Sequence, residues 1–180
     1  MPEDKLLAEY KPRPQTRAAV YTETVCAICS ATLWFFSMRV SRFAALYHLA
    51  AVGFLVAFLF LLTRYTFVDF TYAVVLVGGI PMLRVAQKQG KRLSLPVEIP
   101  LADILSIDTL RRGETPPQYP EDIGNAPRGF RCTVTMLPPV LCAVRARGEG
   151  YGKIRVVMEY DEAFTAALTA YTEQYKNAVN

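Results

Sequence analysis

The chain has 180 residues, of which 52% are hydrophobic, and its formal net charge is +4. This length fits one modest domain with a membrane anchor rather than two full globular domains. The small charge argues against a nucleic-acid surface, which needs a basic stripe with interleaved aromatic residues. Charged residues are rare at 18–86 and of ordinary frequency at 87–180, so the sequence predicts a membrane part followed by a water-facing part.

Residues 1–17 begin with Met-Pro-Glu-Asp-Lys and contain no long apolar run. A secretory signal would carry such a run, and a mitochondrial presequence would be rich in arginine and poor in acidic residues. We therefore expect an uncleaved, polar N-terminal tail that precedes the membrane segments.

Two apolar segments follow, at 18–38 and 43–63. The second contains no formal charge, and a helix of this length spans roughly 30 Å, the thickness of the hydrocarbon core of a bilayer. Only residues 39–42 separate the segments, so we expect a tight antiparallel transmembrane hairpin over 18–64. Lysine and arginine are more frequent outside the hairpin than in its loop, which predicts both chain ends on the cytosolic or mitochondrial matrix side.

Residues 66–86 allow two interpretations. The segment is apolar enough for a third transmembrane helix, but Asp69, Pro81 and Arg84 lie inside it. β-Branched and aromatic residues dominate, and Gly78-Gly79 has the form of a two-residue hairpin turn. We favour strands at 66–77 and 80–87 and keep the third helix as the alternative.

The remaining sequence predicts a soluble, β-rich domain over 65–180. Alternating and apolar patterns indicate further strands at 92–98, 101–110, 130–137, 140–145 and 154–160. Prolines and glycines make 111–129 a long loop, which we interpret as a docking loop. Asp161 caps a C-terminal helix over 161–178, whose apolar residues repeat at helical spacing. The predicted fold class is membrane α+β: a two-helix transmembrane hairpin, then a mostly antiparallel, PH-like half-barrel closed by an amphipathic helix.

A small set of residues could carry an interaction. His48 is the only histidine; hairpin geometry places it level with Trp34 and away from any carboxylate, so we expect a hydrogen bond to a neighbouring subunit, lipid or backbone. Glu23, near the start of the first helix, is expected to face headgroups or a basic partner residue. Four arginines form a basic group around the long loop: Arg111, Arg112, Arg128 and Arg131.

The cysteines do not predict a redox or metal site. Cys26 and Cys29 have C-x-x-C spacing but lie inside a predicted membrane helix, where thiols behave as small apolar groups. Cys132 and Cys142 flank a Pro-Pro turn, in a register that would pair Cys142 with about Thr135 and that disfavours a disulfide. Phosphate loops, dinucleotide-binding turns and nucleophile elbows are absent from the sequence. We expect a non-enzyme with no catalytic, cofactor or metal site.

The order of parts, with Pro-Leu-Ala-Asp-Ile opening a strand at 100–104, resembles small mitochondrial inner-membrane hairpin proteins that assist assembly of respiratory complexes and ATP synthase. It also resembles bacterial membrane-anchored PH-like proteins. The resemblance implies a non-catalytic accessory subunit of a mitochondrial inner-membrane respiratory-chain or ATP-synthase complex, with the β domain on the matrix side. The alternatives are an assembly factor of such a complex and a membrane-anchored PH-like protein that binds lipid or peptide, the latter at the cytoplasmic side of a bacterial plasma membrane. Membrane lipid and other membrane subunits are the expected partners, and nucleic acid is not.

Overall fold

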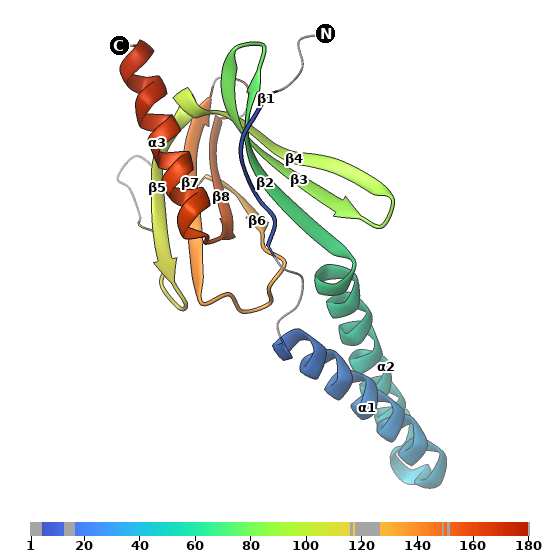
Figure 1. The fold of residues 1–180 in the computed structure, drawn as a ribbon. Helices are drawn as coiled ribbons and strands as arrows, with labels where there is room; N and C mark the ends of the chain where they lie inside the picture. The colour runs from blue at the N-terminus through green and yellow to red at the C-terminus, as the bar shows by residue number, and fades with distance from the viewer. Residues whose placement is uncertain are drawn as a thin grey trace. The chain divides into compact units, whose positions relative to one another are not determined.

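The computed structural model describes residues 5–12, 17–115, 117, 127–148, 150 and 152–179. Contacts divide the chain into two compact units. One comprises residues 1–13, 69–133 and 138–180, and the other comprises 14–68 and 134–137. Figure 1 shows the two long N-terminal helices, the strands that follow them and the C-terminal helix.

The helical hairpin consists of α1 (Arg17–Arg39) and α2 (Ala44–Leu61), joined through the short helix η1 (Ser41–Phe43). A π-helical turn, η2 (Leu62–Thr66), extends α2. Both predicted helices are therefore confirmed, and both are long and apolar enough to cross a membrane.

Small residues bring the two helices of the hairpin together at one point. The hydroxyl of Ser30 in α1 donates a hydrogen bond to the carbonyl of Ala51 in α2 (2.9 Å), and Ala51 is only 1% exposed. Close approach through small residues is the usual way in which membrane helices associate. Ala31 and Gly53 are exposed and do not take part in this contact.

The first sheet has the strand order β1-β2-β3-β4. Its strands are β1 (Lys5–Tyr10), β2 (Val68–Val77), β3 (Ile80–Gln89) and β4 (Arg92–Pro100). Gly78 and Gly79 have φ of 57° and 87°, as a two-residue turn with two left-handed positions requires. The β-hairpin expected at 66–87 is thus confirmed, and the third transmembrane helix is excluded.

Strand β1 corrects the expectation of a polar N-terminal tail. Tyr10 pairs with Tyr72 on the neighbouring strand, and their ring centroids lie 5.9 Å apart. The ring of Phe164 from the C-terminal helix completes this aromatic cluster, with its centroid 6.3 Å from that of Tyr10. The segment before the helical hairpin is therefore an edge strand of the β domain, held by sheet pairing and by aromatic packing.

The second sheet has the order β5-β7-β8-β6. Its strands are β5 (Ile104–Arg111), β6 (Arg128–Cys132), β7 (Val140–Gly148) and β8 (Gly152–Glu159). The prediction for 101–110 is corrected at its start, where Leu101–Asp103 forms a 3-10 turn, η3. The strand expected at 130–137 ends at Cys132. Most of the expected loop 111–129 lies outside the described residues.

The C-terminal helix α3 (Glu162–Val179) begins as predicted. The carboxylate of Asp161 accepts a hydrogen bond from the backbone N–H of Phe164 (2.8 Å), which caps the helix. Phe164 and Leu168 are buried, so the apolar stripe faces the domain core. The architecture is thus two apolar helices followed by mostly antiparallel sheets and a C-terminal helix; β6 alone pairs in parallel, with β8.

Candidate functional site

The helical hairpin contains a polar contact built on His48. The imidazole Nε2 of His48 lies 3.0 Å from the hydroxyl of Ser37, which also donates a hydrogen bond to the carbonyl of Trp34 (2.6 Å). The indole of Trp34 meets the imidazole edge-on, with ring centroids 5.0 Å apart. His48 is therefore level with Trp34, as hairpin geometry predicts. Its partner is a side chain of the same hairpin, whereas we expected another subunit, lipid or backbone.

Glu23 lies in α1 and is 8% exposed. This burial argues against exposure to headgroups, and the other expectation, a basic partner residue, stays a prediction. Cys26 is buried on the same helix, one turn further along, as expected of a thiol that acts as a small apolar group. Both side chains are therefore largely covered by the chain itself.

The four arginines that cluster in the sequence are separated by the fold. Arg111 and Arg112 lie at the end of β5, at one edge of the second sheet, and Arg128 and Arg131 lie on β6 at the opposite edge. Three strand spacings separate these edges, about 14 Å at the usual distance between neighbouring strands. The arginines therefore do not form one basic surface.

Arg128 lines a pocket of about 350 Å³ on the β domain. Its guanidinium carbon lies 5.0 Å from the centroid of the Phe130 ring, and Glu98 lines the same pocket. Glu98 forms an ion pair with Arg84 (2.7 Å). A carboxylate in the pocket offsets the arginine charge, which weakens the case for an anion site here.

Tyr72 links the two sheets in the core of the β domain. Its hydroxyl donates to the carbonyl of Cys132 and accepts from the backbone N–H of Glu159 (3.4 Å). Tyr72 is 0% exposed, and burial raises the pKa of its hydroxyl well above the ordinary range. The group stays protonated at physiological pH and serves as a buried structural donor and acceptor.

The two cysteines of the β domain lie on either side of Met158. Cys132 pairs with Met158 from β6, and Cys142 pairs with it from β7. Two strand spacings, roughly 10 Å, separate these cysteines, too far for a disulfide. The expected absence of a bridge holds, but the register with Thr135 is wrong because β6 does not form a hairpin with β7. Burial raises the pKa of the Cys142 thiol from 9.0 to about 11, so this thiol is unreactive at neutral pH.

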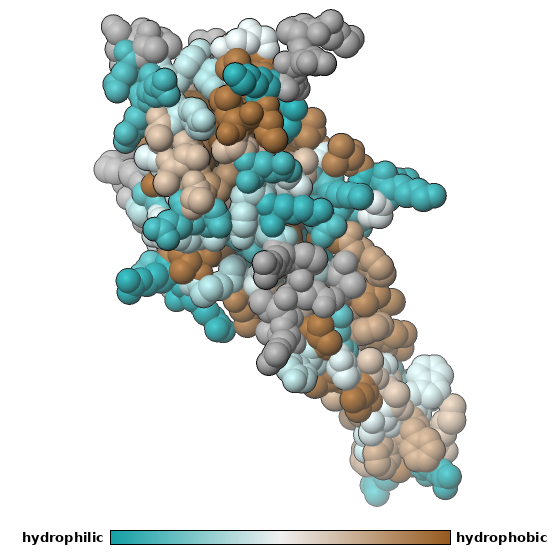
Figure 2. All heavy atoms as spheres, viewed as in Figure 1, coloured by the Kyte–Doolittle hydropathy of each residue, from teal (hydrophilic) through white to brown (hydrophobic). Residues whose placement is uncertain are grey.

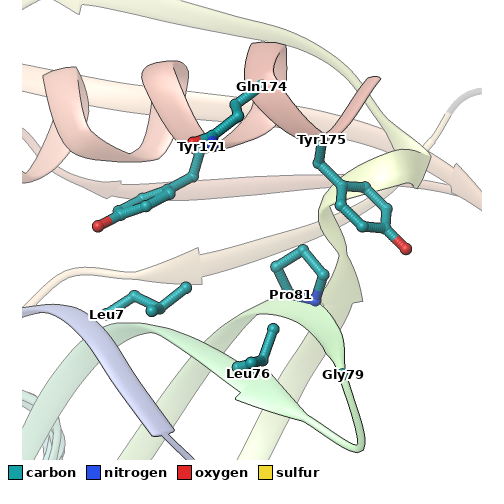
Figure 3. Close-up of a pocket in the computed structure, with 7 residues that line it drawn as sticks. All are labelled: Leu7, Leu76, Gly79, Pro81, Tyr171, Gln174 and Tyr175. Atoms are coloured by element: carbon teal, nitrogen blue, oxygen red, sulfur yellow. The ribbon is translucent and has the colours of Figure 1, made fainter. Parts of the chain in front are cut away.

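A second, apolar pocket of about 260 Å³ lies between α3 and the first sheet. Figure 3 shows Tyr171 and Tyr175 on the helix side and Leu7, Leu76 and Pro81 on the sheet side. A register shift in β1 between Leu6 and Ala8 marks a bulge at Leu7. No local sequence pattern indicates this pocket, because its sheet side depends on the pairing of β1; only the spacing of the two tyrosines on α3 indicates its helix side.

Within the described part of the chain, no three histidine, cysteine, aspartate or glutamate side chains gather in a way that could hold a metal ion. The chain matches no protein-family model, no curated protein and no solved structure. The evidence for a function therefore comes from the structure itself, which has an apolar helical hairpin and a β domain with the two pockets described above.

Proposed function

We propose that this protein is a non-catalytic accessory subunit of a multisubunit membrane complex, held in the bilayer by its helical hairpin. The complex we propose is a respiratory-chain or ATP-synthase complex of the mitochondrial inner membrane, with the β domain on the matrix side. An assembly factor of such a complex would share the same architecture. It would differ in being bound transiently and below stoichiometric amounts.

The exposed apolar surface of the hairpin carries this proposal. Large apolar side chains on both helices are exposed, among them Phe35 (57%) in α1 and Leu49 (72%) and Phe60 (65%) in α2. Figure 2 shows hydrophobic residues along these helices. Apolar surface of this extent needs lipid or protein to cover it. The more polar character of α1, with exposed Thr24 and Thr32, favours protein cover on that helix.

The β domain supports a binding role for the part outside the bilayer. Two four-stranded sheets followed by a C-terminal helix are what we expect of a PH-like half-barrel, and we propose that fold type here. The parallel pairing of β6 with β8 is a departure from a purely antiparallel barrel. Because Arg111 and Arg112 lie at one edge of the second sheet and Arg128 and Arg131 at the other, we favour docking to protein over recognition of a charged lipid or peptide in a single basic pocket.

Copurification tests the accessory-subunit proposal. The full chain, tagged in its native cell, is extracted with a mild detergent and separated on native gels, with mass spectrometry of the comigrating proteins. We expect the chain in one large complex at constant stoichiometry with the same membrane subunits. Migration as a free monomer would contradict the proposal, and a substoichiometric, transient association would identify an assembly factor.

A matched pair of variants locates the interface. Ala31 is a small, exposed residue on α1, so Ala31→Phe should obstruct close approach of a partner helix without disturbing the contact between α1 and α2. Leu59 on α2 is 50% exposed and already large, so Leu59→Phe is the control. We expect Ala31→Phe to release the chain from the complex while Leu59→Phe stays bound.

A further inference from the structure

The tip of the β3–β4 hairpin combines exposed basic and exposed apolar side chains. Lys88, Lys91 and Arg92 are exposed around the turn, and Leu93 and Leu95 follow with 70% and 47% of their surface exposed. No acidic residue occurs between 85 and 97. Figure 2 shows hydrophilic side chains over the projecting end of this hairpin. A soluble surface does not require two exposed leucines on one strand, so the tip has the composition of an interfacial element.

Strand pairing places these side chains together. Leu93 and Leu95 are close neighbours on β4 and both are exposed, next to a register shift that places an extra β4 residue at 95–96. Lys88 is directly opposite Leu93 in the β3–β4 register, and cross-strand partners share a face. The tip therefore has an apolar pair with a cation beside it, and two further cations at the turn.

The position of the tip in the first sheet is fixed by the turn at Gly78-Gly79. Strands β2 and β3 are both ten residues long and this two-residue turn joins them, so the last residue of β3, Gln89, lies beside the first residue of β2, Val68. Helix η2 ends at Thr66, two residues before Val68. Those residues span at most about 7 Å. The tip thus lies at the end of the sheet where the chain arrives from α2.

We propose that residues 88–95 form a second membrane contact, in which the three basic side chains bind anionic lipid headgroups and the two leucines enter the interfacial layer. This inference rests on the proposed anchoring of the hairpin in a bilayer. The covalent tether keeps the domain at the membrane surface, so that even a weak contact is repeatedly formed. Each cation near an anionic leaflet favours binding by about fivefold, so the three together favour the bound tip on the order of a hundredfold.

Tryptophan quenching tests the contact. The full chain has a single tryptophan, Trp34, so a Trp34→Phe background leaves Leu93→Trp as the only indole. The protein is reconstituted in vesicles of phosphatidylcholine, alone or mixed with phosphatidylglycerol, that contain lipids brominated near the headgroup end of the acyl chains. Leu105→Trp in the same background is the matched control, because Leu105 is 45% exposed on β5.

We expect bromolipid to quench Leu93→Trp in anionic vesicles and to leave Leu105→Trp unquenched. Replacing Lys88, Lys91 and Arg92 by Gln should abolish most of that quenching. The proposal is overturned if Leu93→Trp behaves like Leu105→Trp, as it would if the tip docked on protein, or if its quenching is indifferent to lipid charge and to the Gln substitutions. Trp34 of the unmodified chain distinguishes failure of the tip contact from failure of the hairpin anchor. If bromolipid quenches Trp34 but not Leu93→Trp, only the tip contact is wrong. If Trp34 is also unquenched, the anchoring of the hairpin is wrong, and the tip contact with it.

Discussion

The helical hairpin and the β domain place their apolar side chains in opposite ways. In the β domain, Leu83, Ile99 and Leu168 are 0% exposed. In the hairpin, Leu46 and Phe60 are 64% and 65% exposed. Each square ångström of apolar surface left in water costs roughly 25 cal/mol. The β domain buries leucines of this kind in its core, whereas the hairpin leaves large apolar side chains exposed along both helices.

The polar side chains of the β domain and of the helical hairpin also differ in the contacts that they make. In the β domain, Tyr72 is buried between the sheets and satisfies two backbone groups. In the hairpin, the described contacts between α1 and α2 include two polar ones, from Ser30 to Ala51 and between Ser37 and His48. A soluble core gains stability from excluding water, while helices in lipid gain it from close packing and a few hydrogen bonds.

Truncating a leucine should have the largest effect, and only in the β domain. Leu168→Ala creates a cavity beneath α3 and should cost about 2–5 kcal/mol of the free energy of unfolding, measured by denaturant titration in micelles. Leu59→Ala on the exposed face of α2 should cost less than about 0.5 kcal/mol in the same titration. Equal losses at the two positions would contradict the division between a buried core and an exposed hairpin.

Alkaline pH should destabilise the β domain through Cys142. Burial raises the pKa of this thiol from 9.0 to about 11 in the folded state. Below pH 9 the Cys142 thiol is protonated in both the folded and the unfolded state, so its contribution to stability does not change with pH. Above pH 9 the thiol of the unfolded state ionises first, and this contribution falls until the folded thiol also ionises near pH 11. The loss should be about 2–3 kcal/mol. Cys142→Ala should remove this part of the pH dependence in denaturant titrations, and Cys29→Ala in α1 should retain it.

Removing the hydroxyl of Tyr72 should have an intermediate effect. Tyr72→Phe leaves the carbonyl of Cys132 and the N–H of Glu159 without this buried partner, which should cost about 1–3 kcal/mol of the free energy of unfolding. Tyr175→Phe at the edge of the apolar pocket is the control and should be nearly neutral. A neutral Tyr72→Phe in thermal and chemical unfolding would show that the hydroxyl does not link the sheets.

The smallest effect is expected in the hairpin. Ser37 and His48 should show a coupling energy of about 0.6 kcal/mol in a double-mutant cycle, because polar contacts between membrane helices contribute little. Helix unfolding in mixed micelles would measure it. Thr32, whose hydroxyl bonds to the carbonyl of Ile28 on its own helix, is the control and should show no coupling to His48. A coupling of several kcal/mol would mean that the hairpin depends on a buried polar contact, as the β domain depends on the Tyr72 hydroxyl.

Local signals predicted the parts of the fold that depend on neighbouring residues. The uncharged run at 43–63 predicts α2, the Gly78-Gly79 pair predicts the β2–β3 turn, and Asp161 predicts the start of α3. Hairpin geometry also placed His48 beside Trp34. Each of these depends on a helix length, a turn or a cap, and such features are encoded within a few residues.

Features that depend on pairing across the sequence were missed. The strand at 5–10 exists only because it pairs with β2, across the whole helical hairpin. The parallel pairing of β6 with β8 moves Arg128 and Arg131 to the edge opposite Arg111, which no local pattern indicates. The candidate arginine group therefore could not be tested from the sequence, because strand order decides which side chains share a surface.

We propose above all that the helical hairpin lies in a bilayer and that the β domain lies outside it, with only the β3–β4 tip at the interfacial layer. Trp34, 47% exposed on α1 and the only tryptophan of the chain, reports on it without any substitution. The measurement is its fluorescence in the full chain reconstituted with brominated lipids. We predict strong quenching and a blue-shifted emission. Unquenched, water-like emission from protein that remains folded would contradict the claim.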